Sequence, residues 1–205
     1  MRLVRTAALS GAVIAACLVA AGMASATSAA QPRVSLIGDS ITESLDYVPA
    51  ARRYLGRGLD LRSNTAVCRR LVASSCAFQG VQPSTAIGVI RSQRSALGPV
   101  VVVSVGYNDW AAVYDVDKVM RALVAARVHT VVWVALRETT PNYARSNAAI
   151  RNATRVWPNL VVADWDAYSH GKPWFRRDGL HLKPAGAMGL ARLLRPLVLA
   201  GVRSS

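Results

Sequence analysis

Four short runs of apolar residues, separated by longer segments with helical spacing, constrain the fold of this chain more than any other feature. Each run is nearly uninterrupted, as expected of a strand buried on both faces, whereas a half-exposed strand alternates apolar and polar residues. The runs cover residues 34–37, 100–105, 131–136 and 160–163, and helical spacing occurs in 115–127, 142–157 and 184–202. Strands that alternate with helices predict an α/β fold, in which helices cover both faces of a parallel sheet.

The first 30 residues have the layout of a secretory signal peptide. Arg2 and Arg5 precede an apolar stretch over residues 6–24, and small residues before position 31 offer cleavage sites. An uncleaved membrane anchor and a lipid anchor on Cys17 are the alternatives, but the stretch is rich in alanine and stays apolar past Cys17. We therefore expect a secreted protein in which residues 31–205 form a single domain, since no linker or repeat divides them.

The chain is strongly basic, with a formal net charge of +14. Without Arg2 and Arg5 of the leader the charge falls by two, to +12. Such a charge suits an anionic partner, but the arginines are not interleaved with aromatic residues that could stack on bases. We therefore expect no nucleic-acid partner, and contact with an anionic cell-wall polymer remains open.

Two cysteines, Cys68 and Cys76, remain once the leader is removed. In an exported protein, two cysteines are most simply interpreted as one disulfide. Two thiols without a neighbouring group of histidines are too few for a structural zinc site. We therefore expect one disulfide and no metal. We also expect no organic cofactor and a monomeric protein.

A serine near the start of the chain and an Asp–His pair near its end are the candidate catalytic side chains. Ser40 follows the first apolar run, after Gly38 that allows a sharp turn, and a helix is expected to begin at Ser40. Asp178 precedes His181 by three residues across a turn eased by Gly179, so its carboxylate can orient the imidazole. The alternatives are an ordinary helix N-cap for Ser40 and an ordinary turn for the Asp–His segment. A serine hydroxyl beside an oriented imidazole is the nucleophile of an acyl hydrolase.

Two further side chains are candidates for the same site. Asn108 follows the second apolar run, and its side-chain amide can donate to an oxygen that becomes charged during acyl transfer; an ordinary turn residue is the alternative. Trp174 lies just before the Asp–His segment and can line an acyl or sugar pocket, although aromatic residues more often fill cores.

Three segments resemble blocks I, III and V of the SGNH (GDSL-type) hydrolases, in the order of that family: Gly-Asp-Ser-Ile at 38–41, Gly-Tyr-Asn-Asp at 106–109 and Asp-Gly-Leu-His at 178–181. The resemblance implies a three-layer α/β/α sandwich around a central parallel sheet, of the flavodoxin-like type. It also implies a role for each of four residues: nucleophile for Ser40, base for His181, orienting carboxylate for Asp178 and oxyanion donor for Asn108. Independently of the resemblance, a helix that begins at Ser40 would offer free backbone N–H groups and the helix dipole to an oxyanion, so Ser40 is also a candidate donor.

Block II of that family, which supplies a glycine N–H to the oxyanion hole, has no clear match. Residues 59–61 are expected to form the preceding strand, and residues 64–69 occupy the stretch where the donor should lie. A backbone donor needs no particular side chain, so Cys68, held by its disulfide, is one candidate. Gly80 is the other.

Together these features predict a secreted serine hydrolase that cleaves short-chain acyl esters, foremost acetyl esters, through an acyl-enzyme on Ser40. The chain has no segment large enough for a lid domain, which favours a small ester or an acylated carbohydrate as substrate. The alternative is an SGNH-type O-acyltransferase that passes the acyl group to a cell-wall or other glycan. A non-catalytic binder of an anionic polymer is a third hypothesis, but it leaves the set of catalytic side chains unexplained.

Overall fold

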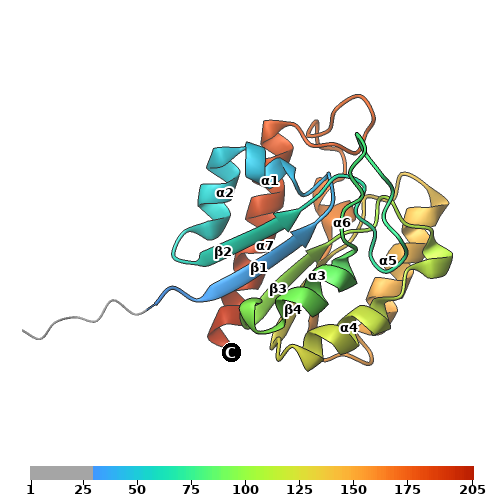
Figure 1. Ribbon diagram of the computed structural model, residues 1–205. Coiled ribbons are helices and arrows are strands. Elements are labelled where there is room, and N and C mark those ends of the chain that lie inside the picture. Colours follow the sequence, from blue (N-terminus) through green and yellow to red (C-terminus); the bar gives the residue numbers. More distant parts are fainter. Residues whose placement is uncertain (1–29) are drawn as a thin grey trace, which may run out of the picture. The chain divides into compact units, whose positions relative to one another are not determined.

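Five parallel strands form one sheet in the computed structural model, which describes residues 30–205 (Figure 1). The strands are β1 (Arg33–Gly38), β2 (Asp60–Thr65), β3 (Val100–Ser104), β4 (Thr130–Val134) and β5 (Leu160–Ala163). Their order across the sheet is β2-β1-β3-β4-β5, the flavodoxin-like order of a doubly wound fold. Residues 31–205 make up one unit, whereas positions 1–29 of the predicted leader lie outside the described residues.

Helices cover both faces of this sheet, so the predicted three-layer α/β/α sandwich is confirmed (Figure 1). One face of the sheet packs against α3 (Ala86–Gln93), α4 (Val116–Ala125) and α5 (Pro141–Ala153). The other face packs against α1 (Ser44–Tyr47), α2 (Pro49–Gly56), α6 (Trp165–Ser169) and α7 (Pro184–Arg203). Two short 3-10 helices, η1 (Arg94–Ala96) and η2 (Ala111–Val113), lie in the connections.

The strands differ in how deeply they are buried, and this difference explains which of them could be predicted from the sequence. Every residue of β3 is buried, because β3 lies between β1 and β4 and carries a helical layer on each face. At the edge of the sheet, β2 pairs with β1 alone, and none of its residues is fully buried. The expectation of a strand limited to residues 59–61 is wrong, because the strand continues to Thr65 through polar residues that its open edge tolerates.

Local signals account for the ends of the helices. Pro184 occupies the first turn of α7, as predicted, and its fixed φ suits that position. The helix expected over 142–157 ends at Ala153, because the chain turns there before β5. Side-chain oxygens accept backbone N–H groups in the first turns of α3, α4, α5 and α6 and so satisfy donors that a helix leaves unpaired; these residues are Thr85, Asp115, Thr140 and Asp164.

Candidate active site

Three predicted side chains come together beyond the carboxyl ends of the strands. They are Ser40, near the start of the described chain, and the pair Asp178 and His181, near its end. Ser40 Oγ lies 3.2 Å from His181 Nε2, and His181 Nδ1 lies 2.8 Å from Asp178 Oδ2. With the Nδ1 proton donated to the carboxylate, Nε2 is left to accept the proton of the serine hydroxyl. This geometry is that of a Ser–His–Asp triad.

The Asp178 carboxylate is held by the backbone of its own turn. Oδ1 accepts the N–H groups of Leu180 and His181 at 2.8 and 2.9 Å, while Oδ2 faces the imidazole. These hydrogen bonds, the one from Leu180 foremost, lower the pKa of Asp178 to about 2. Gly179 makes the turn possible with a φ of 72°, which side chains disfavour. The carboxylate is therefore ionised and fixed in orientation at any pH at which a histidine can act as a base.

Asp39 fixes the turn that carries Ser40. Its side chain is fully buried, and it accepts the N–H of Ile41 with one oxygen and those of Gly106 and Tyr107 with the other, at 3.1 to 3.3 Å. Burial raises the pKa of Asp39 to about 6, although these hydrogen bonds oppose the rise. One carboxylate thus joins the loop after β1 to the loop after β3, where the strand order reverses and ligands bind in such folds.

The structure corrects the expected position of Ser40 relative to the first helix. Ser40 lies in a turn ahead of α1, whose N-cap is Glu43, so the expectation that the helix begins at Ser40 is wrong. The turn closes with the N–H of Glu43 donating to the carbonyl of Asp39 at 3.1 Å. The orientation of the serine therefore depends on this turn and not on a helix dipole.

Thr42 ties the same turn to the neighbouring strand. Its hydroxyl lies 2.5 Å from Ser104 Oγ and donates to the Ser104 carbonyl at 3.1 Å. Gly38 permits this arrangement, because a Cβ at position 38 would lie 2.6 Å from the Cβ of Thr42. The glycine before the serine is thus required by close packing behind the turn.

Asn108 and Cys68, the predicted oxyanion donors, lie in two loops that are hydrogen-bonded to each other. Asn108 Nδ2 donates to the carbonyl of Arg69 at 3.2 Å, which leaves a second amide hydrogen available. Cys68 adopts a φ of 66° and is joined to Cys76, so the predicted disulfide is confirmed. Within residues 30–205, no acceptor is found for the backbone N–H of either Ser40 or Cys68. These N–H groups and one amide hydrogen of Asn108 therefore have no acceptor among the described residues, and their role as oxyanion donors stays a prediction.

Gly80, the other candidate for the backbone donor, lies apart from these contacts. It is exposed, in a turn that Phe78 and Val81 close with reciprocal backbone hydrogen bonds. Unlike Cys68, Gly80 is neither disulfide-bonded nor adjacent to the carbonyl that accepts from Asn108. Cys68 is therefore linked to the Asn108 loop by neighbouring contacts that Gly80 lacks, and which of the two residues is the backbone donor stays a prediction.

Trp174 lies in an aromatic cluster next to the segment that carries the Asp–His pair. Its ring stacks on that of Trp165 with centroids 5.8 Å apart and packs against Gly189 of α7. Tyr168 and Phe175 complete the cluster around the buried Trp165. Trp174 is half-buried, and its contact with a substrate stays a prediction.

Two arginines that the sequence did not single out support the site. The buried Arg69 donates to the carbonyls of Gly38, Asn64 and Ser84, and burial lowers the pKa of its guanidinium. Arg137 donates to the carbonyl of Gly179, and its guanidinium lies 4.0 Å from the centre of the Phe175 ring. In the sequence both look like ordinary members of a scattered basic set, and no signal there distinguishes them.

The part of the chain that the structure describes holds no group of three or more His, Cys, Asp and Glu side chains placed to bind a metal ion. The site brings together a serine hydroxyl, an imidazole, a carboxylate and N–H groups without acceptors. These are the groups that acyl transfer requires.

Comparison with solved structures places this chain beside known esterases. A carbohydrate acetylesterase family member from Sinorhizobium meliloti superposes with a TM-score of 0.59 at 17% identity, covering 84% of this chain and 99% of that one. The psychrotrophic esterase EstA from Pseudoalteromonas sp., solved with monoethylphosphonate as inhibitor, gives 0.51 at 14% identity, covering 85% and 100%. The fold is shared with esterases. No protein-family model and no curated protein matches the sequence.

Proposed function

We propose that this protein is a secreted serine hydrolase of the SGNH type, which removes short acyl groups, foremost acetyl, from ester substrates. The observation that carries the proposal is the chain of contacts from Ser40 Oγ through His181 to Asp178, at 3.2 and 2.8 Å. The fold shared with esterases supports the proposal. Acyl transfer at a Ser–His–Asp triad needs no additional catalytic group.

In the proposed mechanism, His181 Nε2 takes the proton of Ser40 as the oxygen attacks the ester carbonyl. The ionised Asp178 holds the Nδ1 proton and stabilises the imidazolium that forms. The N–H groups of Ser40 and Cys68 and the amide of Asn108 receive the negative charge on the carbonyl oxygen. The imidazolium then protonates the departing alcohol, and a water molecule, activated by the same imidazole, releases the acid from the acyl-enzyme.

The exposure of the triad supports a bulky alcohol on the leaving-group side of the ester. The side chains of His181 and Asp178 are 41% and 47% exposed, so the leaving-group side of the site opens to solvent. The acetylesterase from Sinorhizobium meliloti is described as acting on carbohydrate, and an acetylated carbohydrate is accordingly the first substrate class to test.

Turnover of p-nitrophenyl acetate, butyrate and octanoate tests the reaction, and a phosphonate ester tests the nucleophile. Ser40→Ala should abolish turnover and covalent phosphonylation, with a preference for acetate over octanoate in the unchanged protein. Ser44→Ala is a matched control, because the Ser44 hydroxyl is buried four residues away without a hydrogen-bond partner. A Ser40→Ala variant that keeps its rate, or label found elsewhere than on Ser40, would contradict the proposal.

A further inference from the structure

A second feature of the surface, separate from the triad, is a groove between α3 and α4 lined by positive charge. Four cationic side chains line a hollow of about 260 Å³, together with two alanines of α4. We call it the basic groove, formed by Arg91, Arg94, Lys118 and Arg121. An adjoining hollow of about 340 Å³ shares Arg94 and adds Arg127. The cations therefore gather from two helices onto one face.

The charge of the basic groove is not neutralised by ion pairs. None of its four cations forms a salt bridge with an acidic side chain of residues 30–205, and all four are exposed. The acidic residues near Lys118 bond to uncharged N–H groups instead of to its ammonium group: Asp115 accepts the backbone N–H of Lys118 at 2.8 Å, and Asp117 accepts Trp157 Nε1–H at 2.7 Å. Both line a different hollow, between α4 and α5. The groove thus presents a concentrated positive potential to solvent.

We propose that the basic groove binds a polyanion that is not a nucleic acid, namely a flexible chain bearing repeated carboxylate or phosphodiester groups. Guanidinium groups pair with both kinds of oxyanion through paired N–H donors, and cations from two helices can engage successive groups of one chain. The groove contains no aromatic ring on which a base could stack. A polymer without bases fits these side chains better than single-stranded DNA or RNA does.

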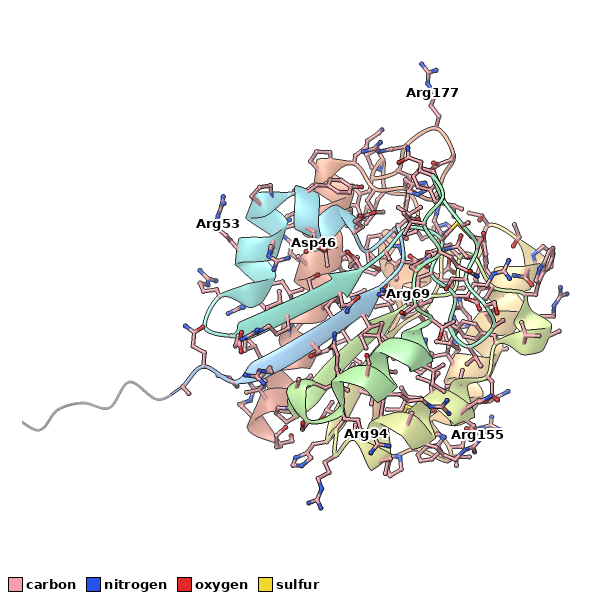
Figure 2. All side chains as sticks on the ribbon, viewed as in Figure 1. Asp46, Arg53, Arg69, Arg94, Arg155 and Arg177 are labelled. Carbon is pink, nitrogen blue, oxygen red and sulfur yellow. A yellow bond between two sulfur atoms is a disulfide. The ribbon has the colours of Figure 1, made fainter. Side chains whose placement is uncertain are left out.

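The position of the basic groove leaves the triad accessible while a polymer is bound. Arg94 ends the helix that leads into the amino end of β3, and the adjoining hollow includes Gly98 in the same connection. Arg177 belongs to the segment before His181, at the carboxyl edge of the sheet, and Figure 2 shows Arg94 and Arg177 at opposite ends of the view. Polymer binding at the groove would therefore hold the protein on an anionic matrix without occupying the site of ester cleavage.

Binding to immobilised polymers tests the proposal, with the full chain carrying Ser40→Ala so that no turnover interferes. The polymers are polygalacturonate for carboxylates, poly(glycerol phosphate) for phosphodiesters, single-stranded DNA, and dextran as a neutral control. The groove variant carries Arg91→Gln, Arg94→Gln, Lys118→Gln and Arg121→Gln. The matched control removes the same charge at exposed positions scattered over the surface, with Arg53→Gln, Arg145→Gln, Arg155→Gln and Arg192→Gln.

We expect the groove variant to lose at least tenfold in affinity for the anionic polymers, and the control variant less than threefold. With four contacts to a flexible polyanion, raising the salt from 50 to 200 mM should weaken binding about 50-fold. Preference between polygalacturonate and poly(glycerol phosphate) identifies which oxyanion the groove takes, and either supports the proposal. Equal losses in the two variants would overturn it, as would tighter binding to DNA than to both other polyanions.

A further readout separates this proposal from the proposed function. With Ser40 restored, the groove variant should hydrolyse p-nitrophenyl acetate at the unchanged rate, because none of its substitutions touches the triad or the loops around it. If the protein bound polyanions but lacked esterase activity, the groove would stand and the proposed function would fail; if it cleaved esters but ignored polyanions, the reverse would hold.

Discussion

Replacing Asp39 by asparagine should reduce the dependence of stability on pH between pH 4 and 7.5. The pKa of this buried carboxyl is raised from 3.8 to about 6 in the folded protein. Between those values the folded state keeps a proton that the unfolded state has released, so the free energy of unfolding falls as the pH rises. At 1.36 kcal/mol for each pH unit, the loss attributable to Asp39 is about 3 kcal/mol.

Only the pH dependence isolates this effect, because the substitution also changes hydrogen bonds. The asparagine oxygen can accept from Ile41, or from Gly106 and Tyr107, but its amide nitrogen cannot accept the remaining N–H. A lost hydrogen bond to a charged group costs about 1.5 to 3 kcal/mol, comparable with the gain from removing a buried charge. A difference in stability measured at any single pH therefore combines two opposed contributions. The change of stability with pH isolates the titration of Asp39, because asparagine does not titrate.

Urea unfolding followed by tryptophan fluorescence, at pH 4.0 and 7.5, measures the difference. Because pH 4.0 already lies above 3.8, about 2.4 of the 3 kcal/mol falls between the two conditions, and the unchanged protein should lose about that much more than Asp39→Asn. Asp109→Asn offers a parallel case, because burial also raises the pKa of Asp109 to about 6. Identical pH dependence in the unchanged protein and in Asp39→Asn would refute the reasoning.

Three further variants test the site. Gly38→Ala should lower stability by about 1 to 3 kcal/mol in thermal unfolding, because its Cβ would meet Thr42, and an unchanged melting temperature would show that the turn can move. Replacing Cys68 and Cys76 by serine removes a cross-link over a separation of eight residues, which the chain-entropy model values at about 2.5 kcal/mol. The same variant should have a lower kcat for p-nitrophenyl acetate. An unaltered kcat would show that the oxyanion site does not depend on the disulfide. Asp178→Asn should reduce kcat on the order of 10⁴-fold at every pH from 5 to 9, because the carboxylate with a pKa of about 2 is ionised throughout. A reduction confined to part of that range would contradict the assigned role.

Features that depend on local sequence could be predicted. The run over 100–105 is apolar because β3 is buried on both faces, and an uninterrupted run is the direct result. Asp178 and His181 could be paired from the sequence because a three-residue spacing with a glycine between them permits only a short turn. The approach of Ser40 to His181 was implied by the resemblance of their segments to blocks I and V of one hydrolase family, and the two side chains lie 3.2 Å apart.

Features that depend on contacts between distant segments could not be predicted. The edge strand β2 could not be recognised from its polar sequence. A strand with one neighbouring strand and one open edge does not need an apolar pattern. Arg69 and Arg137 reach backbone carbonyls 31 and 42 residues away, and nothing in their own neighbourhoods distinguishes them from solvent-exposed arginines. Asp39 belongs to a motif, but its link to the loop after β3 appears only in the folded chain.

The left-handed backbone at Cys68 has a practical consequence for handling the protein. Glycine would adopt this conformation without penalty, but here a cross-linked side chain occupies the position. A thiol reagent therefore acts directly on a segment whose neighbours Ala66 and Arg69 donate to the carbonyl of Gly38, two residues before Ser40. Dithiothreitol in a purification buffer, or expression in a reducing cytoplasm, should yield protein that lacks this constraint. Oxidising conditions belong in the preparation from the first step.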